Sequence, residues 1–385
     1  MLNFEFYNPT RIVFGKKSIA RLDGLVPADA RVLVLYGGGS AERSGTLAEV
    51  RAALGTRALW EFGGIEPNPT YETLMRAVKL VRTEKLDFLL AVGGGSVIDG
   101  TKFVAAAVSF AGDPWKILET FGGAVTDALP IGTVLTLPAT GSEMNCASVI
   151  TKQETLSKLP FMTPFVYPKF SILDPTITYS LPPRQLANGV VDAFTHVIEQ
   201  YLTYPAEGRV QDRFAEGLLQ TLIEIGPKVV NEPADYDSRA NLMWSATMSV
   251  NGLIAAGVAQ DWATHIVGHE LTALYDIDHA RTLAIVLPSM LQLRRESKRV
   301  KLLQYAERVW KITEGSENER IDQAIENTRA FFESLGLKTH LSDYDISADA
   351  IDRLIEQLQV HGMTQLGEHQ DVTLDVSRKV LEASL

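Results

Sequence analysis

Residues 87–102, DFLLAVGGGSVIDGTK, decide the fold class of this chain. The apolar run at 87–92 has the length of a buried strand, three glycines and a serine follow it, and a helix is expected from about Val97. A glycine-rich turn from a strand into a helix lets backbone N–H groups approach a ligand, and the helix N-terminus favours an anion. The stretch therefore predicts a strand–turn–helix unit that cradles a pyrophosphate, although such turns also contain glycine where no ligand binds.

The first half of the chain repeats this alternation. Strand-length apolar runs lie at 31–36, 58–62 and 132–138, and helical spacing lies at 40–54 and 68–84. Strands and helices in alternation predict βαβ units and a mostly parallel sheet covered on both faces. From about Gln185, after a pair of prolines, helical periodicity dominates. We therefore predict a Rossmann-like α/β domain at 1–184 and an all-α domain at 185–385, with a cleft between them.

The composition narrows the class of protein. The chain has 385 residues, of which 46% are hydrophobic and 22% charged, as in a folded globular protein long enough for two domains. Its net charge of -11 argues against binding to nucleic acid or to an anionic membrane. The single cysteine, Cys146, fits a reducing compartment, and neither a signal peptide nor a transmembrane run is visible. We expect a cytoplasmic enzyme or binding protein.

Two further loops contain groups suited to a nucleotide. The glycine cluster YGGGSAERSG at 36–45 follows the strand at 31–36. Neither glycine cluster matches G-x-G-x-x-G or the P-loop pattern, but two such turns on one sheet favour a dinucleotide along the carboxyl ends of the strands. The loop TLPATGSEMN at 136–145 could bind a base, a ribose or a nicotinamide, or simply close a polar turn.

Five acid and histidine side chains in the helical half indicate a metal site. Asp192 and His196, within VVDAFTHVIEQY, are four residues apart and so share one face of a helix. His265 and His269 have the same spacing, and His279 follows them. One such pair alone is more often a hydrogen-bonded core pair, but the whole set favours Zn²⁺ or Fe²⁺. Because a catalytic ion takes three or four protein ligands, spacing leaves open whether His269 or His279 coordinates it.

Six stretches, in chain order, resemble one known family. They are TRIVFGKKSI, FGGIEPNPTYETLMRAVKLVR, LLAVGGGSVIDGTKF, LTLPATGSEMN, NGVVDAFTHVIEQY and GHELTALYDIDHARTLAIVLP. The chain resembles the iron-containing (type III) alcohol dehydrogenases, and within them the bacterial branch of NADPH-dependent aldehyde reductases and butanol dehydrogenases. The resemblance runs essentially end to end and implies a dehydroquinate synthase-like architecture, with an α/β dinucleotide-binding domain followed by a helical metal-binding domain.

The resemblance also implies roles for individual residues. The metal ligands it implies are Asp192, His196, His265 and His279, with iron or zinc as the ion. His269 would lie beside the ligands or on the substrate side, as a candidate catalytic group that passes protons. The dinucleotide contacts would be Gly38, Gly39 and Ser40 at the adenosine ribose, Gly94, Gly95 and Ser96 at the pyrophosphate, and Asn68, Asp99, Thr136, Thr140, Asn145 and Lys158 elsewhere.

The expected reaction is the reversible, NADPH-dependent reduction of small aldehydes to alcohols. NADP(H) is favoured because YGGGS lacks the carboxylate that often binds the ribose of NAD in this superfamily. The metal ion would polarise the carbonyl oxygen while NADPH delivers hydride. We expect aldehydes and alcohols as substrates and, because TRIVFG could form an edge strand, a homodimer.

Other classes of protein fit the sequence less well. A dehydroquinate-synthase-like lyase, which also uses NAD and a metal ion, should have basic residues beside the ligands to bind an anionic substrate. The sequence instead places Phe194, Trp262 and Leu271 there. A metal-dependent hydrolase would leave the two glycine turns unexplained, and a non-catalytic nucleotide-binding module would not need a metal ion with an open coordination position.

Overall fold

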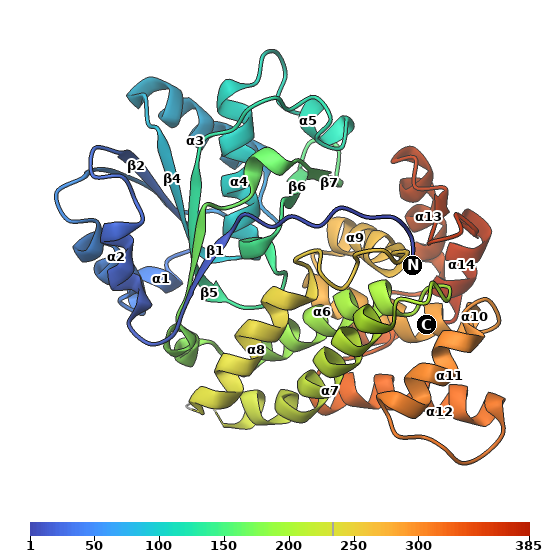
Figure 1. Cartoon of the computed structure of the whole chain (residues 1–385). Helices are drawn as coiled ribbons and strands as arrows, with labels where there is room; N and C mark the ends of the chain where they lie inside the picture. Colours follow the sequence, from blue (N-terminus) through green and yellow to red (C-terminus); the bar gives the residue numbers. More distant parts are fainter. Residues whose placement is uncertain (233–234) are drawn as a thin grey trace. The chain divides into compact units, whose positions relative to one another are not determined.

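The computed structural model describes residues 1–232 and 235–385, which divide into two compact units. One unit, called the sheet unit below, comprises Tyr7–Pro182 and Ala234–Thr247. The other, called the helical unit, comprises Met1–Phe6, Pro183–Pro233 and Met248–Leu385. Figure 1 colours both by residue number.

Among the described residues, the sheet unit contains one parallel sheet of six strands, in the order β1-β8-β5-β4-β2-β3. The strands are β1 (Arg11–Phe14), β2 (Arg31–Tyr36), β3 (Ala58–Phe62), β4 (Phe88–Gly94), β5 (Ile131–Leu137) and β8 (Phe170–Leu173). The mostly parallel sheet predicted from the sequence is confirmed. The short strands β1 and β8 were not among the predicted apolar runs, although TRIVFG was expected as an edge strand, and β1 lies at the edge.

Helices cover both faces of this sheet. The helices of the unit are α1 (Ser40–Arg43), α2 (Thr46–Leu54), α3 (Tyr71–Glu84), α4 (Gly95–Ser109), α5 (Lys116–Glu119) and most of α8 (Tyr236–Ser249). On β2, Leu33 and Leu35 share a core cluster with residues of α3 and α4, whereas Val32 and Val34 share one with residues of α2. Successive strand residues point to opposite faces, so both faces are apolar and both are buried.

The sheet unit also contains a hairpin that the sequence analysis missed. Strands β6 (Ala147–Lys152) and β7 (Ser157–Met162) pair antiparallel, and β6 lies against α4. Its turn at 153–156 has no Asn-Gly or Asp-Gly signal. Strand β4 continues through Gly93 and Gly94. The helix follows directly at Gly95, two residues before the predicted Val97.

The helical unit is a layered arrangement of long helices. They are α6 (Pro183–Tyr201), α7 (Arg209–Asn231), α9 (Ala263–Tyr275), α10 (His279–Leu293), α11 (Arg299–Arg308), α12 (Glu317–Ser334), α13 (Ile351–Val360) and α14 (Leu374–Glu382). One short antiparallel pair, β9 (Gln365–Leu366) with β10 (Val372–Thr373), is an exception to the predicted all-α character. Within the described residues, no helix is long and apolar enough to span a membrane.

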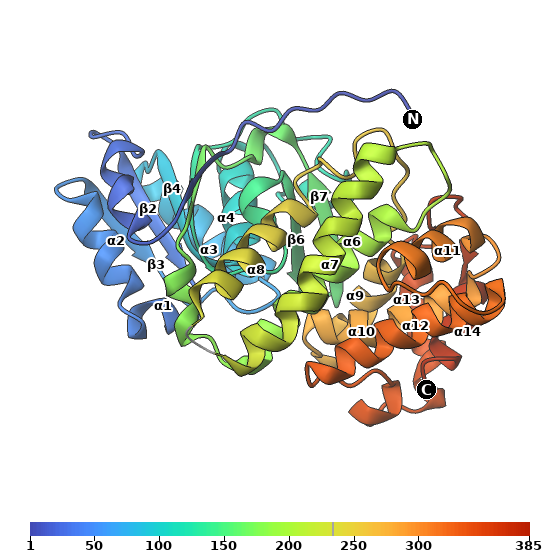
Figure 2. The same ribbon diagram turned by 60° about the horizontal axis from the view of Figure 1, so that its bottom comes forward.

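Helix α6 is the central helix of this unit. It packs against α7 on one side and α10 on the other, and Figure 2 shows α6 and α7 side by side. From Gly189 to its end at Tyr201, every residue of α6 is buried. A helix enclosed in this way must bury its polar side chains as well, so each of them needs a partner.

Candidate active site

Asp192 and His196 lie on one face of α6, as their spacing predicts. His196 Nδ1 is 3.4 Å from Asp192 Oδ1. Only 3% of Asp192 and 8% of His196 is exposed. The pair therefore brings an acid and an imidazole together in a largely dry environment, where each needs a compensating charge or hydrogen bond.

The carboxylate of Asp192 is also close to histidines from two other helices. Asp192 Oδ1 lies 4.0 Å from His265 Nε2 on α9 and 3.8 Å from His279 Nε2, which belongs to the first residue of α10. The ligand atoms of Asp192, His265 and His279 all lie within 4.8 Å of one another. A carboxylate oxygen and imidazole nitrogens are the donors that Zn²⁺ and Fe²⁺ accept. These three residues can therefore hold a divalent ion.

His196 is also suited to bind such an ion. Its ring centre is 4.4 Å from that of His265. Burial lowers the pKa of His196 to about 4, although Asp192 opposes this shift. The imidazole is therefore neutral at neutral pH, which is the form that binds metal ions.

His269 lies one helical turn after His265 on α9. Its ring centre is 5.0 Å from that of His279, at a tilt of 41°. The three close ligand atoms include one of His279, so His269 lies near this group.

The structure adds Glu199, which the sequence analysis did not single out. It lies seven residues after Asp192 on α6 and is 2% exposed. One of its carboxylate oxygens contacts Nδ1 of His265. Its two oxygens also accept the backbone N–H groups of Thr264, at 2.6 Å, and His265, at 3.2 Å. Burial, and then the charge of Asp261, raises the pKa of Glu199 well above its usual value, and the backbone N–H groups oppose that rise.

A buried ion-pair network holds the start of α9. Asp261 accepts the backbone N–H of Ala263 at 3.0 Å and pairs with Lys298 Nζ at 2.8 Å. Lys298 Nζ also lies 2.7 Å from Glu368 and donates to the carbonyl oxygen of Leu202 at 2.6 Å. Because 1% of the Lys298 side chain is exposed, its ammonium depends on these three acceptors. The network fixes the first turn of the helix that contains His265.

One of the three apolar neighbours expected at the ligands is found there. The ring of Trp262 lies 5.3 Å from that of His265 and 6.0 Å from that of His196. Phe194 instead packs against Phe331 and Phe332, because its position on α6 points it toward α12. Leu271 belongs to a hydrophobic core cluster of the helical unit. The expectation is therefore confirmed for Trp262, whereas Phe194 has its ring contacts with α12 and Leu271 lies in the core cluster.

The three loops predicted to bind a dinucleotide follow neighbouring strands. β2, β4 and β5 are adjacent in the sheet, and the predicted residues lie at 37–40 after β2, at 94–96 where β4 passes directly into α4, and at 138–145 after β5. The chain passes from β2 to β3 on one side and then to β4 on the other, so the strand order reverses between β2 and β4. Ligands of open parallel sheets bind at the carboxyl ends of the strands beside such a reversal.

At two positions in these segments, the local structure requires glycine. Gly39 has φ +95° and caps the N-terminus of α1, a backbone conformation that glycine adopts most readily. A Cβ at Gly95 would collide with the side chain of Thr140, so α4 can begin close to the third loop only with glycine there. Gly38 and Ser40 are exposed, and the N-terminus of the fifteen-residue α4 offers backbone N–H groups to an anion.

The other predicted cofactor residues fall into two groups. Lys158 on β7 donates to Asn68 Oδ1 at 2.9 Å, which brings two of them together. Asp99 and Asn145 belong to a network around Lys102, whose side chain is fully buried. Lys102 Nζ donates to Ser142 Oγ at 2.8 Å, to Asn145 Oδ1 at 2.9 Å and to the carbonyl oxygen of Ala147 at 2.7 Å, and Ser142 Oγ donates to Asp99 at 2.5 Å.

Lys102 was not among the residues selected from the sequence. Burial lowers the pKa of Lys102 to about 8, and the charge of Asp99 opposes that shift. Thr136 and Thr140 are half-buried at the end of β5 and in the loop that follows. The Lys102 network therefore gives this loop a fixed shape beside the glycine turn of α4.

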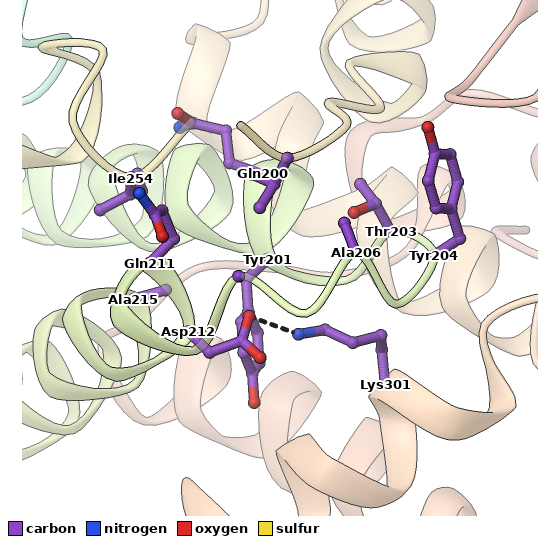
Figure 3. A pocket seen from close by; sticks show the side chains of 12 residues that line it. Gln200, Tyr201, Thr203, Tyr204, Ala206, Gln211, Asp212, Ala215, Ile254 and Lys301 are labelled. Carbon is purple, nitrogen blue, oxygen red and sulfur yellow. Dashed lines mark hydrogen bonds and ion pairs between the residues drawn. The ribbon is translucent and has the colours of Figure 1, made fainter. Parts of the chain in front are cut away.

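A pocket between α6 and α7 does not provide a substrate site. Its lining includes Tyr201, Gln211, Asp212 and Lys301, and Figure 3 shows Lys301 reaching Asp212 across it, at 2.7 Å. Lys301 Nζ also lies 4.1 Å from the centre of the Tyr201 ring. The space open to a water-sized sphere is about 10 Å³, enough for one water molecule.

Two family models match the chain. One, described as iron-containing alcohol dehydrogenase, matches residues 9–175, and the other, described as the C-terminal part of the Fe-containing alcohol dehydrogenase family, matches residues 186–384. The chain is 60% identical over 386 residues to the NADPH-dependent aldehyde reductase YqhD of Escherichia coli (strain K12), with 100% of both chains covered. It is 40% identical to the probable NADH-dependent butanol dehydrogenase 1 of Bacillus subtilis (strain 168), again with 100% of both covered.

Solved structures agree with these relationships. The crystal structure of E. coli K-12 YqhD superposes with a TM-score of 0.99 at 60% identity, covering 100% of this chain and 99% of that one. NADH-dependent butanol dehydrogenase A from Thermotoga maritima superposes with a TM-score of 0.95 at 34% identity, with the same coverage. The chain belongs to the iron-containing alcohol dehydrogenase family.

Proposed function

We propose that this protein is an NADPH-dependent aldehyde reductase that converts small aldehydes to alcohols at a divalent metal centre and can act reversibly as an alcohol dehydrogenase. The observation that supports this most directly is the cluster of Asp192, His265 and His279 in a chain 60% identical, over its full length, to an NADPH-dependent aldehyde reductase. Family membership and the three loops at neighbouring strand ends support a dinucleotide as the second component.

The proposed ligands are Asp192, His196, His265 and His279, and the ion is iron or zinc. Their donor set fits such an ion, since one carboxylate and three imidazoles come together in a largely buried place. When bound, the ion supplies a Lewis acid for the carbonyl oxygen and NADPH supplies the hydride. The four side chains hold the ion and also present a surface with little water, beside the ring of Trp262.

His269 is proposed to carry the proton that the alcohol product requires. Its position beside His279 supports this role, because imidazole is the side chain that most readily both gives and takes a proton near neutral pH. Asp192, by contrast, is assigned to the ion, since three histidines surround its carboxylate.

The dinucleotide contacts are proposed as the sequence predicted them. Gly38, Gly39 and Ser40 would bind the adenosine ribose and its phosphate, Gly94, Gly95 and Ser96 the pyrophosphate, and Asn68, Asp99, Thr136, Thr140, Asn145 and Lys158 the rest of the cofactor. The length of α4 and the exposure of the first glycine loop support this assignment. NADPH is preferred in the proposal because the 60%-identical relative uses it and because the loop after β2 has no carboxylate.

A dehydroquinate-synthase-like lyase is the alternative, and the full-length relatives named as reductases and dehydrogenases disfavour it. The proposed enzyme is cytoplasmic, in keeping with its single cysteine, and forms a homodimer, supported by the edge position of β1. Light scattering after gel filtration tests the dimer, and a monomeric mass would refute it.

The decisive assay follows NADPH absorbance in the near ultraviolet with butanal and metal-replete protein. The expected result is oxidation of NADPH that depends on both the aldehyde and the metal ion. The matched reaction with chelated protein should show none, and reloading with Fe²⁺ or Zn²⁺ should restore it. No oxidation with any short aldehyde after reloading would refute the proposal.

A further inference from the structure

We infer that Glu199 is the positioning residue that sets the tautomer and the orientation of His265, an inference that rests on the proposed metal centre. Glu199 contacts Nδ1 of His265, whereas Nε2 of the same ring lies 4.0 Å from Asp192 Oδ1. The two ring nitrogens point away from each other, so a contact that holds Nδ1 also aims Nε2. The nitrogen aimed at the ligand cluster is therefore determined by Glu199.

The contact also selects where the proton of His265 resides. Glu199 already accepts two backbone N–H groups, which favour its ionised form, and an ionised carboxylate only accepts hydrogen bonds, so Nδ1 is the donor in this contact. In a neutral imidazole, a proton on Nδ1 leaves the lone pair on Nε2. That lone pair is what a metal ligand needs. Without Glu199, the ring could take the other tautomer, in which Nε2 carries hydrogen and cannot bind the ion.

Glu199 is itself fixed by hydrogen bonds from the first turn of α9. Helix α9 begins at Ala263, so the N–H groups of its first turn have no acceptor within the helix. The two oxygens of Glu199 accept two of these groups, from Thr264 and His265. The backbone and the ring of His265 are thus fixed by one carboxylate, which comes from the same helix as Asp192. The ligands of α6 and α9 are thereby kept in register.

Glu199→Gln tests the inference, because glutamine keeps the size of the side chain and one acceptor oxygen but removes the charged acceptor from Nδ1. The protein is stripped with a chelator, and its Zn²⁺ affinity is measured by competition with a coloured chelator. Removing a group that orients a metal ligand typically costs about 10–100-fold in metal affinity. We expect a loss in that range for Glu199→Gln and a larger loss for Glu199→Ala.

Glu270→Gln is the matched control. Glu270 lies on α9, is 5% exposed and accepts from Nδ1 of His361 at 2.7 Å, so it is a similarly buried acid that pairs with a histidine. Its replacement should leave Zn²⁺ affinity unchanged. An equal loss in both variants would show a general effect of burying an amide, and it would overturn the inference.

Nitrogen NMR of the histidine rings measures which ring nitrogen of His265 is protonated, which Glu199 would not affect if it only capped α9. In the wild-type Zn²⁺ form, the resonances that disappear in His265→Ala should report a proton on Nδ1. In Glu199→Gln they should shift or broaden, while those of the other histidines stay in place. A proton on Nε2 of His265 in the wild-type protein would overturn the inference, and this measurement stands even if no Glu199 variant folds.

The outcomes separate this inference from the proposed function. If His265→Ala keeps its Zn²⁺ affinity, the proposed ligand set is wrong. If His265→Ala loses the ion but Glu199→Gln binds it as tightly as the wild type, only the role of Glu199 is refuted, and its function is then limited to capping α9.

Discussion

Placing an aspartate at Gly38 should reduce the preference of this enzyme for NADPH. Gly38 is exposed in the loop after β2, has no positive φ, and a Cβ there would meet no atom within 4 Å. Gly38→Asp is therefore free of steric cost. At Gly39, by contrast, φ is +95° and a Cβ would lie 3.2 Å from Nη1 of Arg43. Gly39→Asp would add backbone strain and would also draw the Arg43 guanidinium away from a phosphate.

The size of the effect follows from charge repulsion. A carboxylate about 4 Å from the 2′-phosphate of NADPH is disfavoured by about 4 kcal/mol per charge pair at an effective dielectric constant near 20. The loop is exposed, so solvent should leave about half of that, and about 2 kcal/mol corresponds to roughly a 30-fold change in affinity. NADH lacks this phosphate and should bind as before, or better if the new carboxylate reaches its 2′-hydroxyl.

Steady-state kinetics with both cofactors and one aldehyde measures this change, and the effect should lie mainly in the KM for NADPH. Gly38→Asn has nearly the same size without the charge and should keep most of the native preference. Gly39→Asp should show a larger loss that includes weaker binding of NADH, because strain affects both cofactors. A native preference for NADH, or equal behaviour of Gly38→Asp and Gly38→Asn, would refute the assignment of this loop to the 2′-phosphate.

Four further predictions concern other residues. His265→Ala should lose bound metal and aldehyde reduction yet keep NADPH binding, and metal analysis with cofactor fluorescence checks this; full metal occupancy would contradict it. His269→Gln should keep most of the metal but lower turnover and alter the pH profile, whereas loss of metal would make His269 a ligand. Lys102→Met should remove three hydrogen bonds, deprive the buried carboxylate of Asp99 of a nearby positive charge and destabilise the protein by about 3–5 kcal/mol, with a raised KM for NADPH but normal metal content; an unchanged melting temperature would contradict it. The hydrogen bond from His361 to Glu270 raises the pKa of His361, so its contribution to stability is complete below about pH 6.5 and is lost as the pH rises through the folded-state value. Thermal melts of Glu270→Gln should therefore show a smaller fall in stability from acidic to mildly alkaline pH than the wild type, and equal falls would contradict this.

The parts of the fold that the sequence predicts are those with strong local patterns. The runs at 31–36 and 58–62 match β2 and β3 residue for residue, because both are apolar segments bounded by polar or glycine residues. The strands β1 and β8 have four residues each, so the sequence indicates β1 only as an expected edge strand within TRIVFG and does not indicate β8. Their identity depends on pairing with each other and with β5, which is tertiary information.

In the candidate site too, the sequence predicts features with a local pattern and not those that depend on tertiary contacts. Asp192 with His196, and His265 with His269, are visible because spacing of four residues places both members on one helical face. Trp262 was expected near the ligands, but it reaches them through a left-handed backbone at φ +66°, which no periodicity indicates. Phe194 was expected there as well, and it packs elsewhere because a helix buried on every side has apolar residues that face away from its polar ones.

The sequence does not indicate the buried positions of Glu199 and Lys102, and the physical reason is the same for both. Each is a charged residue within an apolar helix, and the sequence alone cannot distinguish an acid or lysine that faces solvent from one that is buried. Burial of an unpaired charge costs several kcal/mol, so both positions are tolerable only because other segments supply partners. For Glu199 these partners are N–H groups at the start of α9, and for Lys102 they include the carbonyl oxygen of Ala147. Backbone groups leave no trace in residue identity.

The buried charges of Glu199 and Lys102 limit which substitutions the candidate metal and cofactor sites can accept. The proposed ligand His265 can be replaced by another residue only if that residue also donates to Glu199, since Glu199 accepts from both the backbone and the ring of His265. Likewise, the loop that contains Ser142 and Asn145 can vary only within the reach of one buried ammonium. The side chains proposed to touch the ion or the cofactor are therefore constrained twice, by the chemistry they perform and by buried charges that would lose their partners if those side chains moved.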